Sequence, residues 1–145
     1  MGITIEDVES VRFSAPDLAQ MRRFLLDFGM SEAEDAGDGV LRMRGTGDAP
    51  YLHETVEGEP GFVSVAVRAR SVEDLRRLAQ EEGASVEAAS GPGGGSVVRL
   101  RDPNGFLIEV IAGKARAPAL PHGVRDGWNT MTGRQRPGAP KRLAP

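Results

Sequence analysis

The sequence contains no cysteine and only two histidines among its 145 residues. Without cysteine there can be no disulfide, no thiolate nucleophile, no cysteine-ligated zinc and no iron–sulfur cluster. Two histidines by themselves cannot build a three-histidine metal site. No run of apolar residues approaches the roughly 20 needed to cross a bilayer, and the N-terminus has neither the basic nor the apolar segment of a secretory signal. The sequence therefore predicts a soluble cytoplasmic domain without a membrane partner.

Charge is distributed unevenly along the chain. Residues 1–113 carry eleven basic and twenty acidic side chains, a net charge of −9. Residues 114–145 carry seven basic side chains against one acidic, a net charge of +6, and five of the ten prolines. A segment of this composition buries too little apolar surface to form a core. We therefore predict a folded module over 1–113 and a basic C-terminal arm or linker over 114–145.

The basic arm raises the question of nucleic-acid binding. Its large aromatic content is limited to Trp128, and the acidic module would repel phosphate, so no nucleic-acid partner is expected. We favour Trp128 instead as an anchor that docks the arm in an apolar pocket, with a place in a partner interface as the alternative.

The module contains an internal repeat with an offset of 54 residues. The segment 17–29 aligns without a gap on the segment 71–83, and each opens on a helix-capping residue and closes on a glycine. Apolar residues recur at helical spacing in both. They are Leu18, Met21, Leu25 and Phe28 in the first copy, and Val72, Leu75, Leu78 and Ala79 in the second. We predict amphipathic helices over 17–28 and 71–82.

The same offset relates the strands that flank each helix. The strands predicted in the first copy are Val8–Ala15, about 30–35, Val40–Arg44 and Tyr51–Val56. Those predicted in the second copy are Phe62–Ala69, Ser85–Ala88, Ser96–Arg101 and Phe106–Ile111. The glycine-rich stretch 91–95 is assigned to a hairpin or loop, because it opens no helix and lacks the lysine of a phosphate-binding loop.

Each copy is therefore predicted to be a βαβββ unit, the first over about 8–57 and the second over about 62–112. One such unit leaves one side of its sheet bare, so the two copies are expected to pair and curl around each other. The predicted fold class is α+β, with a curved mixed sheet that encloses a cleft.

The paired units and the segment 102–110 resemble the vicinal oxygen chelate superfamily, which includes glyoxalase I, bleomycin-resistance proteins and extradiol ring-cleavage dioxygenases. The segment reads Asp-Pro-Asn-Gly-Phe-Leu-Ile-Glu-Val and is similar to the closing DPxGxxxEv strand of that superfamily. The resemblance covers positions 8–112. Segments 11–18 and 44–52 look most like the first, non-catalytic half of two-module type I extradiol dioxygenases, in which 114–145 would be the linker to a second module.

The resemblance implies a divalent metal with ligands from the first and last strand of each copy, which in extradiol enzymes are two histidines and a glutamate. Carried over by the 54-residue offset, these corners are Ser10, Thr55, Ser64 and Glu109. Hydroxyls are poor ligands for iron or zinc at neutral pH, and one carboxylate alone will not hold either ion. We therefore expect no metal and no catalytic residue in this chain. Fe(II) or Mn(II) is expected only in a catalytic module elsewhere.

Alternation along the strands predicts one apolar sheet face that packs under the helices. The opposite face is predicted to present Arg12, His53, Arg68 and Glu109, which we assign as candidate binding residues for a small anionic or aromatic ligand. Because buried charges must be paired, an ion pair of Glu109 with Arg12 or Arg68 is the competing structural interpretation. His53 has no visible orienting partner, so a hydrogen-bonded residue is a simpler interpretation than a general base.

Three functions remain open. The chain is the metal-free first half of an extradiol ring-cleavage dioxygenase-type protein, or a stand-alone small-molecule binding protein of the bleomycin-resistance kind. The third possibility is a glyoxalase- or dioxygenase-type metalloenzyme whose ligands differ from those mapped above. The resemblance also implies a partner, either a second copy in a homodimer or a second vicinal oxygen chelate module.

Overall fold

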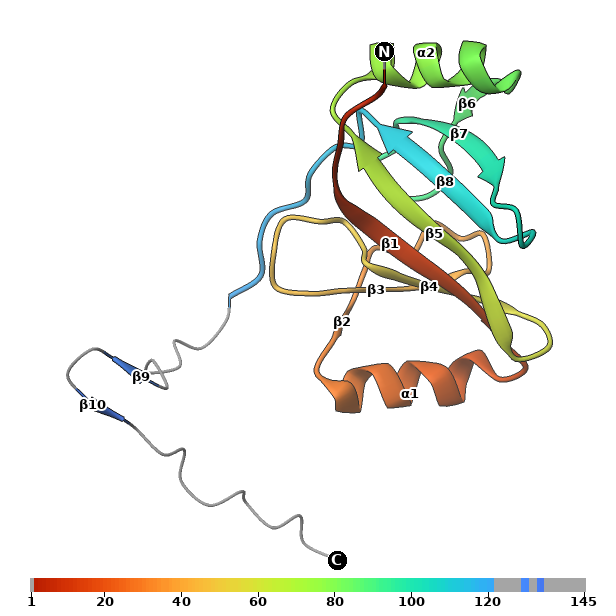
Figure 1. The fold of residues 1–145 in the computed structure, drawn as a ribbon. Helices are drawn as coiled ribbons and strands as arrows, with labels where there is room; N and C mark the ends of the chain where they lie inside the picture. Colours follow the sequence, from red (N-terminus) through yellow and green to blue (C-terminus); the bar gives the residue numbers. More distant parts are fainter. Residues whose placement is uncertain (1, 122–128, 131–132, 135–145) are drawn as a thin grey trace, which may run out of the picture.

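The computed structural model of the chain describes residues 2–121, 129–130 and 133–134. The strands of the first repeat are β1 (Ile5–Ala15), β2 (Ser31–Glu32), β3 (Leu41–Arg44) and β4 (His53–Glu57). Those of the second repeat are β5 (Gly61–Ala69), β6 (Val86–Ala88), β7 (Ser96–Arg101) and β8 (Leu107–Ala112). They form one mixed sheet in the order β2-β3-β4-β1-β5-β8-β7-β6 (Figure 1). The predicted α+β fold class is confirmed.

Both predicted helices form, and each begins after the expected capping side chain. Helix α1 (Leu18–Phe28) follows Asp17, and helix α2 (Val72–Glu82) follows Ser71. Each of these side chains accepts a hydrogen bond from the backbone N–H three residues further on, at 2.9 and 3.1 Å. Each helix ends at a glycine in the left-handed region, with φ of 105° and 64°. Neither described helix is both long and apolar enough to span a membrane.

The strand order is symmetric and follows the repeat. β1 pairs with β4 in parallel, β5 pairs with β8 in parallel, and β1 and β5 run antiparallel at the centre. Antiparallel neighbours complete each half, β3 and β2 beside β4, and β7 and β6 beside β8. The two βαβββ units therefore join through their first strands. A separate two-stranded sheet is formed by β9 (Asn129–Thr130) and β10 (Gly133–Arg134).

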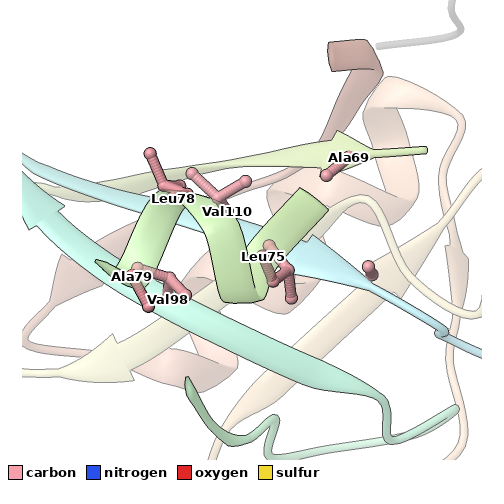
Figure 2. Packing of buried hydrophobic residues seen from close by; sticks show 7 residues of the cluster. Ala69, Leu75, Leu78, Ala79, Val98 and Val110 are labelled. Carbon is pink, nitrogen blue, oxygen red and sulfur yellow. The ribbon is translucent and has the colours of Figure 1, made fainter. Parts of the chain in front are cut away.

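The main apolar core lies under α2 (Figure 2). Leu75 has no exposed surface, and Leu78 and Ala79 are also buried. They belong to one cluster with Val98 of β7 and Val110 of β8. Full burial of a leucine side chain contributes roughly 1.5–3 kcal/mol. The second repeat therefore has a helix that is closely packed on its sheet.

Helix α1 is packed less closely than α2. Within the described part of the chain it buries Leu25 and contacts β2, β3 and β4. Phe24 and Phe28 stack on each other with ring centroids 6.2 Å apart, and they are 60 % and 77 % exposed. At the 54-residue offset Phe24 corresponds to Leu78, which α2 buries. The position shared by Phe24 and Leu78 is thus exposed in the first repeat and buried in the second.

The first residues of the basic arm lie on the module. The backbone N–H groups of Ala115, Ala117 and Leu120 donate to carbonyls of two module loops, at 2.8–2.9 Å. The arm therefore starts as part of the folded surface. Trp128 lies outside the described residues, so its docking stays a prediction.

Candidate functional site

The sheet has an apolar face and a charged face. Val98 and Val110 belong to the core under α2, and their neighbours along each strand point to the opposite side of the sheet. We call that opposite side the charged face. It comprises Ser10, Arg12, Arg42, Glu54, Ser64, Arg99 and Glu109.

Glu54 is buried on β4 and binds two arginines. One carboxylate oxygen accepts a hydrogen bond at 3.0 Å from Nε of Arg42, its register partner on β3. The other oxygen accepts from Nε and Nη2 of Arg12, at 3.1 and 2.9 Å. Arg42 also donates to both oxygens of Asp38, at 2.8 and 2.7 Å, and this pairing lowers the pKa of Asp38 to about 2.

Glu109 repeats this arrangement on β8. One oxygen accepts a hydrogen bond at 3.1 Å from Nε of Arg99, its register partner on β7. The other oxygen accepts from the Ser64 hydroxyl at 2.9 Å and lies 4.0 Å from Nη1 of Arg12. Arg99 also pairs with Glu87. In each repeat an arginine therefore forms ion pairs with two carboxylates, one of them the buried glutamate. The two sets are Asp38–Arg42–Glu54 and Glu87–Arg99–Glu109.

The structure changes the residue of the first repeat that corresponds to Glu109, from Thr55 to Glu54. The offset of 54 residues matches Glu109 with Thr55. Arg12 and Ala66 are equivalent positions of the two repeats, 54 residues apart. In the sheet, the register partner of Arg12 is Glu54, and that of Ala66 is Glu109. The second repeat therefore has one more residue between its first and last strands than the first repeat has. Because a shift of one residue moves a side chain to the other face, Thr55 points away from the charged face.

His53 does not join the charged face. As the neighbour of Glu54 along β4 it points to the helix side, where its ring stacks on Phe13 with centroids 5.4 Å apart. Burial lowers the pKa of His53. The prediction that His53 shares a face with Glu109 is wrong, because the one-residue difference between the repeats reverses the expected alternation in β4.

Arg68 lies four residues after Ser64 in β5 and binds carboxylates other than Glu54 and Glu109. Its guanidinium is 3.2 Å from Glu9 and also contacts two more exposed acids near the start of β1. Glu9 is 2 % exposed and lies where the β1–β5 register shifts, so a bulge turns it inward. The alternative pair of Glu109 with Arg68 does not form. Glu109 lies near Arg12 and is bonded to Arg99.

Glu9 also attracts the first residue of the arm. The ammonium of Lys114 is 3.8 Å from a Glu9 oxygen and 3.6 Å from the centroid of the Tyr51 ring. Among the described residues it has no hydrogen-bond partner. Burial lowers the pKa of Lys114 and raises the pKa of Tyr51 to about 12. Lys114 is therefore held by charge and ring contact rather than by hydrogen bonds.

The charged face leaves little free space. The cavity between Arg12, Tyr51, Glu54, Arg99 and Glu109 measures about 10 Å³. That is roughly the space of one water molecule. A ligand larger than water would need the surrounding segments to move.

The glycine-rich stretch 91–95 is a loop, as predicted, and it lies against this network. A Cβ on Gly91 would lie 3.0 Å from the Arg42 guanidinium, and one on Gly93 would lie 2.8 Å from the carbonyl oxygen of Ala115. Gly93 also has a φ of 88°. Glycine is therefore required for the loop backbone to approach both Arg42 and the arm.

The charged face does not fit a divalent metal. The structurally equivalent corners are Ser10, Glu54, Ser64 and Glu109, and both carboxylates are already bound by arginines. In residues 2–121 and the two short described strands, no group of three or more His, Cys, Asp or Glu side chains is placed to hold a metal ion. We expected one glutamate among the four corners, and the structure places two there, because Glu54 takes the corner assigned to Thr55. The other two corners, Ser10 and Ser64, carry hydroxyls, which are poor metal ligands.

Sequence reasoning did not single out Arg42, Arg99 or Glu54. A signal for the arginines exists, since 41–44 reads Leu-Arg-Met-Arg and 98–101 reads Val-Arg-Leu-Arg. Arginine alternates with apolar residues in these two corresponding strands, which is the pattern of one charged and one buried face. Glu54 carried no comparable signal, because the sequence offset assigned its role to the following residue.

Two βαβββ repeats joined in one sheet define the vicinal oxygen chelate fold, and solved structures of this fold match the chain. The Mn(II)-bound glyoxalase from Novosphingobium aromaticivorans matches with a TM-score of 0.69 and 23 % identity, over 83 % of this chain and 43 % of that one. The homoprotocatechuate 2,3-dioxygenase from Brevibacterium fuscum, in complex with 3,4-dihydroxyphenylacetate, matches with a TM-score of 0.69 and 21 % identity, over 82 % of this chain and 40 % of that one.

These similarities show the fold, and the chain spans less than half the length of either solved structure. No family model matches the sequence. No curated protein matches it.

Proposed function

We propose that the chain is the metal-free first half of an extradiol ring-cleavage dioxygenase-type protein, a module that packs against a catalytic module of the same fold. The observation that carries this proposal is the charged face, where arginines bind both Glu54 and Glu109 and leave a cavity of about 10 Å³. The share of the dioxygenase that the chain covers, 40 %, supports it. The Fe(II) or Mn(II) of such a protein would belong to the other module. The cytoplasm is its proposed location.

Metal analysis tests this proposal. The purified chain is incubated with Fe(II) or Mn(II) without oxygen, gel-filtered, and its bound metal is counted. We expect less than about 0.1 ion per chain, because the carboxylates are paired and the other corners are hydroxyls. Oxygen uptake with 3,4-dihydroxyphenylacetate is expected to stay at the rate of buffer. About one ion per chain together with oxygen uptake would instead identify a glyoxalase- or dioxygenase-type metalloenzyme.

A stand-alone small-molecule binding protein of the bleomycin-resistance kind is the alternative. The side chains of Arg12 and Arg99 are 21 % and 35 % exposed at the cavity, so an anionic or aromatic ligand would meet positive charge there if the loop 91–95 moved. Of the four ligand-binding candidates, Arg12 and Glu109 would form such a site, while His53 and Arg68 lie outside it. Calorimetric titration with catechols and aromatic drugs separates the two functions, since micromolar binding favours the alternative.

A packing module needs a docking surface, and we propose the α1 face, formed by Met21, Phe24 and Phe28. A hollow of about 270 Å³ adjoins it, lined in part by Ala15, Met21 and Phe24. Neighbouring aromatic side chains that are 60 % and 77 % exposed, as Phe24 and Phe28 are, are typical of interfaces. Because the matched structures are more than twice as long as the matched region, they leave room for a second module, which we propose as the occupant. In a solution of this chain alone the same face would bind a second copy.

A further inference from the structure

Arg12 lies at the centre of the charged face. It comes from β1, the strand through which the first repeat joins the second, and its guanidinium faces one oxygen of each glutamate. The distances are 2.9 Å to Glu54 and 4.0 Å to Glu109. The other oxygen of each glutamate binds the arginine of its own repeat. The position equivalent to Arg12 in the second repeat holds Ala66, so one guanidinium serves both glutamates.

The charges of the network show what Arg12 contributes. The carboxylates are those of Asp38, Glu54, Glu87 and Glu109, and the guanidinium groups are those of Arg12, Arg42 and Arg99. The net charge of this set is −1 with Arg12 and would be −2 without it. The side chains of Glu54 and Glu109 are 3 % and 6 % exposed, so solvent screens their charges poorly, whereas Asp38 and Glu87 are 36 % and 52 % exposed and are screened by solvent. Removing Arg12 would leave the buried glutamate oxygens that face it, one of Glu54 and one of Glu109, without the cation between them.

We infer that Arg12 is a built-in substitute for a divalent cation between Glu54 and Glu109, and that it ties the two repeats together through them. A guanidinium donates five N–H groups in one plane and stays protonated in proteins, so it can serve carboxylates from two strands at once. Being part of the chain, it neutralises them without any metal supply. The inference rests on the metal-free part of the proposed function and is independent of the dioxygenase assignment.

Thermal unfolding of Arg12→Ala, with and without Mn(II), tests the inference. In the unmodified chain, millimolar MnCl₂ or EDTA is expected to move the unfolding midpoint by less than about 1 °C. In EDTA the midpoint of Arg12→Ala is expected to fall by about 10 °C, because two buried carboxylates lose their shared counter-ion. Millimolar Mn(II), which prefers oxygen ligands, is expected to recover about half of that loss.

Two further variants make the result specific. Arg77→Ala is the control, because among the described residues Arg77 pairs with one buried carboxylate, that of Asp74 on α2, and a single carboxylate does not hold a divalent cation. Its midpoint is expected to fall without any response to Mn(II). Arg12→Lys keeps the charge but loses the planar fork, so an intermediate midpoint and no response to Mn(II) are expected. If Arg12→Ala is unfolded in EDTA, the far-ultraviolet circular dichroism regained with Mn(II) becomes the readout.

The possible failures are distinguishable. If neither Arg12→Ala nor the unmodified chain responds to Mn(II), the inference is overturned while the metal-free function stands. If Mn(II) raises the midpoint of the unmodified chain as much as that of Arg12→Ala, both are overturned, because a metal then binds beside Arg12.

Discussion

Glu54 and Glu109 are tolerated inside the sheet because every strand beside them supplies a donor. A buried carboxylate without partners is costly, and a buried ion pair adds little net stability over a well-packed apolar pair. Removing one partner is different, since it leaves the other charge buried and unpaired. Arg12, Arg42 and Arg99 are therefore expected to be more sensitive to mutation than arginines whose ion pairs lie on the surface, such as Arg22.

Arg42→Ala tests this cost. Arg42 and Glu54 are 2 % and 3 % exposed, so we expect a loss of unfolding free energy of about 3 kcal/mol or more, measured by equilibrium unfolding in urea. Arg22→Ala is the control, because Arg22 pairs with Glu32 on the surface, and a loss below about 1 kcal/mol is expected. Equal losses in the two variants would contradict the importance of the buried network.

His53 gives the chain a pH dependence. Burial lowers its pKa from the ordinary value of 6.5, so the unfolded chain binds this proton more tightly than the folded chain. Stability present above pH 6.5 is therefore lost as the pH falls from there toward the folded pKa. His53→Phe preserves an aromatic ring against Phe13 and removes the titration. Between pH about 7.5 and about 5.5, urea unfolding should show a smaller loss in His53→Phe than in the unmodified chain, and identical losses would count against this explanation.

At the scale of elements, the two helices differ in what they cover. Helices α1 and α2 come from aligned sequences and have the same caps, yet α2 has a closed core beneath it while Phe24 and Phe28 of α1 are exposed. The repeat therefore conserves local structure more closely than packing. The two halves of the module are expected to differ in stability.

Alanine substitutions at equivalent helix positions measure the difference. Leu75 is fully buried, so Leu75→Ala is expected to lower the unfolding free energy by about 3 kcal/mol or more. Met21, 54 residues earlier, is only partly buried, and Met21→Ala is expected to cost about 1 kcal/mol. Both are measured by urea unfolding. A larger loss for Met21→Ala would show that α1 is the better-packed helix.

The loop 91–95 offers a matched pair of glycines. Gly93 and Gly94 both have positive φ, but only at Gly93 would a Cβ come within 2.8 Å of a backbone oxygen, that of Ala115. Gly93→Ala is therefore expected to cost at least about 1 kcal/mol more than Gly94→Ala in urea unfolding. The amide of Ala115, which donates to the Gly93 carbonyl, should also exchange faster in Gly93→Ala. Equal losses would mean that the arm does not constrain this loop.

At the scale of the whole molecule, the α1 face is expected to drive association. Phe24 and Phe28 are exposed in one chain, so the double variant Phe24→Ser, Phe28→Ser should weaken a dimer without unfolding the module. We expect the dimer dissociation constant to rise roughly tenfold or more in sedimentation velocity. Phe106→Ser is the control, because Phe106 is 52 % exposed and lies outside α1. A chain that stays monomeric at high concentration would contradict self-association through this face.

Local signals in the sequence were sufficient for most of the fold. The caps at Asp17 and Ser71, the helical spacing after them and the 54-residue repeat predicted both helices and the strands of both βαβββ units. The βαβββ repeat then pointed to the α+β sheet that the structure confirms. These signals act within a few residues or by comparison of one copy with the other, so they require no knowledge of contacts between distant strands.

The composition of the charged face was decided only by the tertiary structure. Whether Glu54 or Thr55 faces Arg12 depends on strand register, and one extra residue in the second repeat changes the answer for all of β4, His53 included. The sequence by itself determined that two copies of one unit exist and that Glu109 lies on the last strand. Only the folded sheet placed both Glu54 and Glu109 beside the guanidinium of Arg12, because the two repeats come together through the pairing of β1 with β5.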